Sequence, residues 1–178
     1  FATYAATYKP IGINVGGLTT DSTGVLTNLA KVKPEYTNHF EVGIKSNPVP
    51  FVTINGALFD DEIKDYQTNV QSPQLGLNRG YLANAEKVRV FGVELDASVQ
   101  VKQYLSLNGS FAYTDGKYVK FTNAPLPLED TGLKVDGESI YFKDSAGAQL
   151  PGISKFTFSV RAKASTKEFK FINKKTKF

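Results

Sequence analysis

Hydrophobic and polar residues alternate strictly through the stretch that begins at Phe91. The apolar positions are Phe91, Val93, Leu95, Ala97 and Val99, and Gly92, Glu94, Asp96 and Ser98 lie between them. Successive side chains of a strand point to opposite faces, so the pattern predicts a strand with one apolar and one polar face. In a soluble sandwich the apolar face is the core, whereas in a transmembrane barrel it contacts lipid and the polar face lines the lumen. This stretch alone fits both.

Period-two patterns recur along the whole chain, and no helical periodicity competes with them. They predict strands at about 1–9, 35–47, 51–67, 87–100, 104–119 and 153–165. Several of these exceed the roughly five to six residues of globular strands, and runs of about ten residues suit tilted membrane strands. The sequence therefore predicts an all-β chain with long strands.

The connections between the predicted strands alternate between long and short. Segments 10–34, 68–86 and 120–152 are long and rich in Gly, Pro, Asn, Thr and Asp, whereas 47–50 and 101–103 are tight breaks. In an up-and-down meander this alternation places every long connection at one end of the sheet. Outer-membrane barrels have this layout, and compact soluble domains rarely contain three such loops. The alternation favours a membrane barrel over a soluble sandwich.

The upper edge of the apolar face can also be located. Before Phe91 the pattern inverts, since Lys87 and Arg89 occupy the apolar side of the strand. Charged side chains do not face hydrocarbon without cost. We therefore expect the apolar band to end near Arg89 and the strand to project beyond the membrane there.

Composition excludes several other classes of protein. The 178 residues contain no cysteine, which removes disulfide scaffolds and thiol chemistry, and no run of 18 apolar residues that would predict a transmembrane helix. The net charge of +4 comes from the end of the chain, where seven Lys or Arg from Arg161 onward face one acid, leaving 14 basic and 16 acidic groups in the rest. This distribution predicts no nucleic-acid partner.

Two pairs of titratable residues share the polar faces of predicted strands: His39 with Glu41, and Glu94 with Asp96. One histidine and one carboxylate do not make a metal site, which needs several converging ligands. No nucleophile or second carboxylate system accompanies Glu94 and Asp96. We therefore predict no catalytic residue and no metal site, and interpret all four as polar residues that face a lumen.

Several segments resemble consecutive pieces of the barrel of TonB-dependent outer-membrane receptors. Shared features are a Pro-Glu before a strand that ends E-x-G-x-K-S, an aromatic-then-Asp strand that ends in Gln, and Asn-Ala leading into V-x-G-V-E-L. The matching segments are FATYAATYKPIGIN (1–14), KPEYTNHFEVGIKSN (33–47), ALFDDEIKDYQTNV (57–70), NAEKVRVFGVELDASVQ (84–100), LSLNGSFAYTDGKYVKFTNAP (105–125) and QLPGISKFTFSVRA (149–162). They follow the family's order across roughly residues 1–165.

The resemblance implies an antiparallel up-and-down transmembrane β-barrel segment of a larger barrel, of the roughly 22-stranded type. Residues 1–165 would belong to the barrel, with extracellular loops near 10–34, 68–86 and 120–152, and 166–178 would be a basic tail or a partial next strand. An open sheet edge is not tolerated in lipid, so further strands and the plug domain are expected outside this chain. The implied location is the outer membrane of a Gram-negative bacterium.

The resemblance also implies a function. Such a receptor binds a scarce nutrient, for example a ferric siderophore, and imports it with energy that TonB delivers through the plug domain. The expected partners are outer-membrane lipid, TonB and an extracellular small-molecule ligand such as an iron chelate, with no covalently bound cofactor. Two alternatives stay open from the residues alone, namely a passive porin-like barrel and a soluble β-sandwich binding module.

Within 68–86, Arg79 and Tyr81 are the candidate ligand-binding residues. Arginine presents a forked cation that suits a carboxylate- or hydroxamate-bearing chelate, and tyrosine offers amphipathic contact area. Loops held by a rigid scaffold are where binding residues concentrate. We therefore expect this segment to contribute to ligand selectivity.

Overall fold

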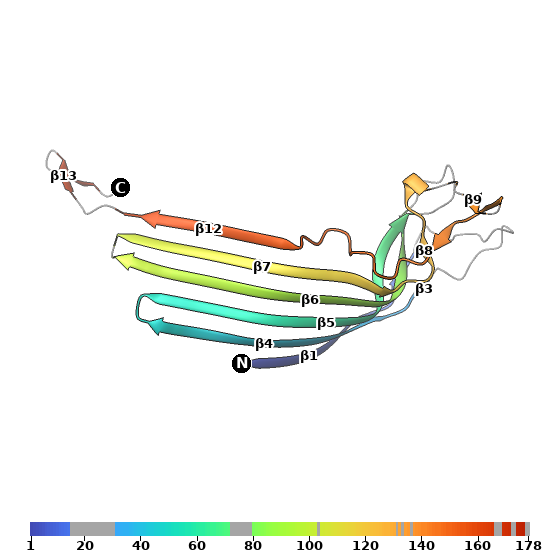
Figure 1. Cartoon of the computed structure of the whole chain (residues 1–178), viewed down its shortest axis with the longest axis horizontal. Coiled ribbons are helices and arrows are strands. Elements are labelled where there is room, and N and C mark those ends of the chain that lie inside the picture. The colour runs from blue at the N-terminus through green and yellow to red at the C-terminus, as the bar shows by residue number, and fades with distance from the viewer. Residues whose placement is uncertain are drawn as a thin grey trace.

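The computed structural model describes residues 1–14, 31–71, 80–102, 104–130, 132, 134–135, 137–165, 169–171 and 174–176. Its main feature is an antiparallel six-stranded sheet with the order β1-β4-β5-β6-β7-β12, an up-and-down meander (Figure 1). The strands are β1 (Ala2–Lys9), β4 (Glu35–Val49), β5 (Val52–Gln71), β6 (Gly80–Lys102), β7 (Leu105–Lys120) and β12 (Phe156–Ala164).

Each of the six predicted strands corresponds to one of these, but β5 and β6 are longer than predicted. Their ladder continues through Val70 and Tyr81 to Gln71 and Gly80, so the prediction of a loop over 68–86 is wrong for 68–71 and 80–86. The physical reason lies at Asp65, whose φ of 52° is a left-handed conformation within the strand. A strict period-two pattern cannot be followed across such a position.

Short ladders occupy parts of the other two predicted loops. The first connection contains β2 (Gly12–Ile13) paired with β3 (Lys31–Val32). The third contains β8 (Ala124–Pro125), the 3₁₀ turn η1 (Leu128–Asp130), β9 (Lys134–Val135), β10 (Glu138–Ser139) and β11 (Phe142–Lys143). Near the end of the chain β13 (Phe169–Phe171) pairs with β14 (Lys174–Thr176), and the proposed domain boundary at residue 165 stays a prediction.

The two ends of the sheet differ in their connections, as predicted. A tight turn at 50–51 joins β4 to β5, and β6 reaches β7 between Lys102 and Leu105; we call this the turn end. The long connections lie at the opposite end, the loop end (Figure 1). Among the described residues, no helix is long and apolar enough to cross a membrane.

The register places apolar and polar side chains on opposite faces of the sheet. Partners Val42, Leu58, Val93, Tyr113 and Phe156 form one row across five strands of the apolar or outer face. The exposed apolar residues that these five strands place on the outer face include Phe40, Val42, Ile44, Ile54, Leu58, Phe91, Leu95, Leu107, Phe111, Phe156, Phe158 and Val160. From the row of Val93 toward the turn end, this face is an apolar band, the part of the sheet that the sequence predicts to face lipid.

Charged side chains begin on the outer face directly above this band. Arg89 donates two hydrogen bonds of 2.8 Å to the carboxylate of Asp60, and Lys87 contacts Glu62 at 3.1 Å. The apolar pattern of β6 thus ends between Phe91 and Arg89, where the sequence predicted the boundary.

The only compact hydrophobic core of the described residues lies at the loop end. It contains Ala85, Val88, Tyr118, Phe121, Ala124 and Leu150, with Ile63, Tyr66, Val70, Val90 and Ile153 packed against it. Gly116 allows this packing, because a Cβ there would lie 2.5 Å from Ile153 Cδ1 and 3.1 Å from Leu150 Cδ1. The third connection therefore folds back onto the upper part of the inner face.

Candidate functional site

The upper part of the β5–β6 hairpin is held between two connections, and the first holds it through polar contacts. Gln67 is 6% exposed and its amide nitrogen donates to the carbonyls of Pro10 (2.8 Å) and Lys33 (3.0 Å). Asn84 accepts from the Lys33 amide at 2.8 Å, and Asn14 exchanges two hydrogen bonds with the backbone of Leu82. These contacts fix residues 10–14 and 31–33 against the hairpin.

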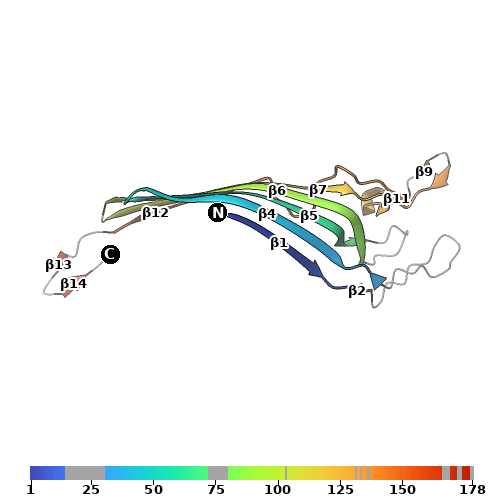
Figure 2. The same ribbon diagram turned by 90° about the horizontal axis from the view of Figure 1, so that it is seen from below.

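The third connection packs on the other face of the same hairpin. Tyr66 and Val70 on β5, and fully buried Ala85 on β6, contact the core that includes Phe121 and Leu150. The backbone of this connection is also tied to β7, since Leu150 N donates to Gly116 O at 2.9 Å. The hairpin thus joins the two connections into one packed unit at the loop end (Figures 1 and 2).

A cleft of about 550 Å³ opens within this unit, and we call it the rim cleft. Residues from three separate segments line it: Val32 and Lys33 from the first connection; Tyr81, Leu82, Ala83, Asn84 and Glu86 from β6; and Phe121, Asn123 and Phe142 from the third. A volume of this size, walled by aromatic side chains with a few polar groups, is typical of small-molecule sites.

Tyr81, one of the two predicted ligand residues, is part of the wall of the rim cleft. Its side chain is 6% exposed, and burial raises the pKa of its phenol to about 12. No described residue forms a hydrogen bond with its hydroxyl, and burial keeps the phenol neutral at physiological pH. Its role as a ligand contact stays a prediction, and Arg79 lies outside the described residues.

Glu86 supplies the carboxylate of the rim cleft. Its side chain accepts hydrogen bonds from the hydroxyl of Thr122 and, at 3.3 Å, from the Thr122 backbone amide. Burial acts to raise the pKa of Glu86, but these hydrogen bonds and the nearby charge of Lys120 outweigh it and hold the pKa below its usual value. The carboxylate therefore stays ionised at neutral pH and links β6 to the third connection.

Lower on the inner face, the structure brings together the predicted pair His39 and Glu41 with a third residue that the sequence did not indicate. His39 Nδ1 lies 2.7 Å from Asp61 Oδ1, and Nε2 lies 3.5 Å from Glu41 Oε2. Asp61 is the Cα partner of His39 on β5. The hydrogen bond to Asp61 raises the pKa of His39 most, burial opposes it, and Glu41 raises it further.

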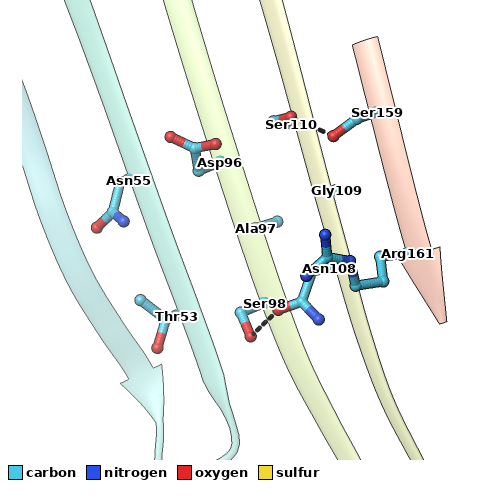
Figure 3. A pocket seen from close by; sticks show the side chains of 10 residues that line it. All are labelled: Thr53, Asn55, Asp96, Ala97, Ser98, Asn108, Gly109, Ser110, Ser159 and Arg161. Atoms are coloured by element: carbon cyan, nitrogen blue, oxygen red, sulfur yellow. Dashed lines mark hydrogen bonds between the residues drawn. The ribbon is translucent and has the colours of Figure 1, made fainter. Parts of the chain in front are cut away.

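Glu94 and Asp96 lie on the inner face of β6 and both are exposed, and their position in a lumen stays a prediction. Asp96 lines an inner hollow of about 310 Å³ near the turn end (Figure 3). Two hydrogen bonds cross its floor between strands, from Ser98 Oγ to Asn108 Oδ1 at 2.9 Å and between the hydroxyls of Ser110 and Ser159 at 2.7 Å. Arg161 and Asp96 supply its charges.

The described part of the chain contains no group of three His, Cys, Asp or Glu side chains placed to hold a metal ion. The His39 cluster is a hydrogen-bonded line along and across two strands, and its ring nitrogens are already engaged with carboxylates. The inner face therefore presents a polar wall, with the rim cleft above it.

Sequence reasoning missed most of the residues that line the rim cleft. Phe121, Asn123 and Phe142 lie in the segment 120–152, which has no periodic pattern. Glu86 and Asn84 fall in the part of β6 that precedes the strict alternation. The recurrence of aromatic residues within a polar, proline-containing connection was the available signal, because a solvated loop does not require them.

The chain was compared with known proteins. Residues 1–170 match the family model described as TonB dependent receptor-like, beta-barrel. A solved structure described as "Copper transporter OprC" is similar with a TM-score of 0.52 and 19% identity, covering 66% of this chain and 18% of that chain. At this identity the likeness concerns the fold alone, and the chain spans less than a fifth of that protein. No curated protein matches the chain.

Proposed function

Because the chain belongs to the TonB-dependent receptor-like β-barrel family, we propose that it is the wall and part of the ligand-binding rim of an active-transport receptor. Proteins of this family lie in the outer membrane of Gram-negative bacteria and are transporters rather than enzymes. In this proposal the receptor binds a scarce nutrient at the loop end and imports it with energy from TonB, acting through a plug domain.

The observation that carries the proposal is the combination of a two-faced sheet with a built cleft at its loop end. The apolar outer face suits lipid, the polar inner wall suits contact with a plug or with water, and the rim cleft lies where the long connections meet. Long loops of outer-membrane barrels are extracellular, so the cleft would open toward the source of the nutrient.

The ligand is proposed to be a metal chelate, with a ferric siderophore as the first candidate. Aromatic side chains of the rim cleft offer flat apolar contact to an organic chelator, and the neutral phenol of Tyr81 is a hydrogen-bond donor for its oxygen atoms. Arg79 is proposed to supply a cation for the carboxylate or hydroxamate groups of such a ligand. A copper complex is the second candidate, since the similar solved structure is described as a copper transporter.

A passive porin-like barrel has the same two-faced strands, so the strands alone do not distinguish the two functions. The packed loop end favours the receptor, because a freely permeable pore has no need of an aromatic-walled cleft joined from three segments. The family match weighs against the soluble β-sandwich, and the described strands form one large sheet without a second large sheet stacked on it.

The test is uptake by the full-length receptor in cells that lack other receptors of this family. Radiolabelled iron bound to a hydroxamate or catecholate chelator, and radiolabelled copper, would be offered with TonB present or deleted. TonB-dependent accumulation of an iron chelate supports the proposal, and TonB-dependent accumulation of copper alone would replace iron by copper. Accumulation that is unchanged by TonB deletion would make the protein a passive barrel. Comparing uptake by Tyr81→Ala with uptake by the exposed-site variant Tyr141→Ala would test whether the rim cleft binds the ligand.

A further inference from the structure

Three lysines lie side by side on the outer face just above the apolar band. Lys64 of β5 is the Cα partner of Lys87 of β6, which is the Cα partner of Lys120 of β7. On the other side of Lys64, the row continues with Tyr36 and Tyr8. Neighbouring strands are about 4.8 Å apart, so the outermost two lysines are separated by roughly 10 Å.

The acids of this region compensate the row only in part. Glu62 pairs with Lys87 at 3.1 Å, and Glu86 interacts with Lys120, but Lys64 has no hydrogen bond or ion pair to any described residue. Arg89 and Lys117 lie one outer-face row lower, and they are already paired with Asp60 and Asp115 of the row below them. Like charges directly opposite one another destabilise a sheet, so a bound anion would relieve this arrangement.

A hollow of about 480 Å³ lies on the same face beside the lysine row. It is lined by Arg89, Phe91, Asp115, Lys117 and Val119. The exposed side chain of Phe91 (39%) gives it an apolar part at the upper edge of the band, and the exposed Val119 (47%) lies next to Lys120, at the level of the lysine row. The outer face thus presents cations above and apolar surface below, which is the order of phosphate and acyl chain in a membrane lipid.

We propose that this lysine row binds the phosphate of an outer-leaflet lipid head group, whose acyl chains lie on the apolar band below. Lysine ammonium groups form charge-assisted hydrogen bonds to phosphate oxygens, and basic residues at the membrane surface attract anionic lipid. The flanking Tyr8 and Tyr36 occupy the interfacial level where tyrosine is favoured in membrane proteins. This inference goes beyond the proposed transport function and does not depend on the ligand.

The experiment uses the full-length receptor in a neutral detergent and measures lipid binding by native mass spectrometry. The probe is phosphatidic acid, compared with a diacylglycerol that has the same acyl chains and no phosphate. The outer variant, Lys64→Gln with Lys120→Gln, removes two cations from the lysine row on the outer face. The matched control, Lys45→Gln with Lys163→Gln, removes two lysines from the inner face.

The outer variant should bind phosphatidic acid more weakly by about fivefold for each lysine removed, with diacylglycerol binding unchanged. The inner control should bind like the wild type, and Lys64→Arg with Lys120→Arg should retain binding. Heat-dependent gel mobility checks that each barrel is folded. Should the double variant fail to fold, Lys64→Gln alone serves, because this side chain has no partner among the described residues.

If phosphatidic acid bound equally weakly to the inner and outer variants, the proposal would be overturned, because the effect would reflect net charge alone. Unchanged binding in the outer variant would also overturn it. Inorganic phosphate is the third arm: if it displaces phosphatidic acid at comparable concentration, the row is a small-anion site and the assignment to lipid is wrong.

Discussion

The ring of Phe59 lies directly over its Cα partner Gly92 on the inner face of the sheet. A Cβ at Gly92 would overlap the ring and would lie 3.0 Å from the carbonyl oxygen of Tyr113. An aromatic ring over a strand glycine covers backbone that no side chain of its own can cover. The pair therefore fixes both the β5–β6 register and a close approach to β7.

Replacing Gly92 with alanine should destabilise the full-length barrel by about 1–3 kcal/mol, because the ring or the strand must move. The control is Gly109→Ala, where the nearest heavy atom to a new Cβ is Ser159 O at 3.9 Å. Unfolding in guanidinium, followed by intrinsic fluorescence or by gel mobility, would measure the stability of both variants. Phe59→Leu combined with Gly92→Ala should recover part of the loss, and a purely additive pair would contradict the contact.

Gln67 is the second position where a single change should have a defined effect. Gln67→Ala removes the donor to the carbonyl of Pro10 and leaves the carbonyl of Lys33 with Asn84 Nδ2 alone, which should cost about 1–3 kcal/mol locally. Hydrogen exchange should then increase in residues 31–35 and 80–84, whereas the strands of the apolar band should exchange as before. The exposed neighbour Asn69→Ala is the matched control. Exchange that rises equally in both variants would contradict the bridging role.

The long strands were predictable because a sheet with two different environments forces a period of two on the sequence. The positions of β4, β7 and β12 follow from this alternation within a few residues, as does the boundary at Arg89. The upper halves of β5 and β6 were not predictable, because the left-handed Asp65 interrupts the alternation and both faces of the hairpin above it are packed.

The site was predictable only in part, for a related reason. His39 and Glu41 share a face by simple parity, so their neighbourhood follows from the sequence. Asp61 joins them through the β4–β5 register, which one sequence does not specify until the turn at 50–51 is known. The rim cleft depends on contacts between segments about 50 to 110 residues apart, such as Val32, Tyr81 and Phe142, and aperiodic connections carry no signal for such pairings.

Tyr81 should behave as a packing residue whose hydroxyl serves the ligand. Tyr81→Phe should leave stability nearly unchanged, since no described residue bonds to the hydroxyl, whereas Tyr81→Ala should cost about 2–4 kcal/mol because the ring is 6% exposed. The exposed Tyr141→Ala should cost little. In a spectrophotometric pH titration the wild type should retain a tyrosine that ionises near pH 12, and Tyr81→Phe should remove it. If every tyrosine of the wild type ionised near the ordinary pKa of a phenol, the burial of the Tyr81 ring would be contradicted.

His39 should make the stability of the receptor depend on pH. The hydrogen bond to Asp61, assisted by Glu41, raises the pKa of His39 above 6.5 despite the opposing effect of burial. Because the folded pKa exceeds the unfolded one, this contribution to stability is fully present below about pH 6.5 and is lost as the pH rises through the folded pKa. The wild type should therefore lose thermal stability in that interval relative to His39→Gln, whose thermal stability should not change with pH there.

An NMR titration of the His39 ring measures its pKa directly, and Asp61→Asn should lower this pKa because the dominant partner loses its charge. A His39 pKa at or below 6.5 in the wild type, or one unmoved by Asp61→Asn, would contradict the pairing.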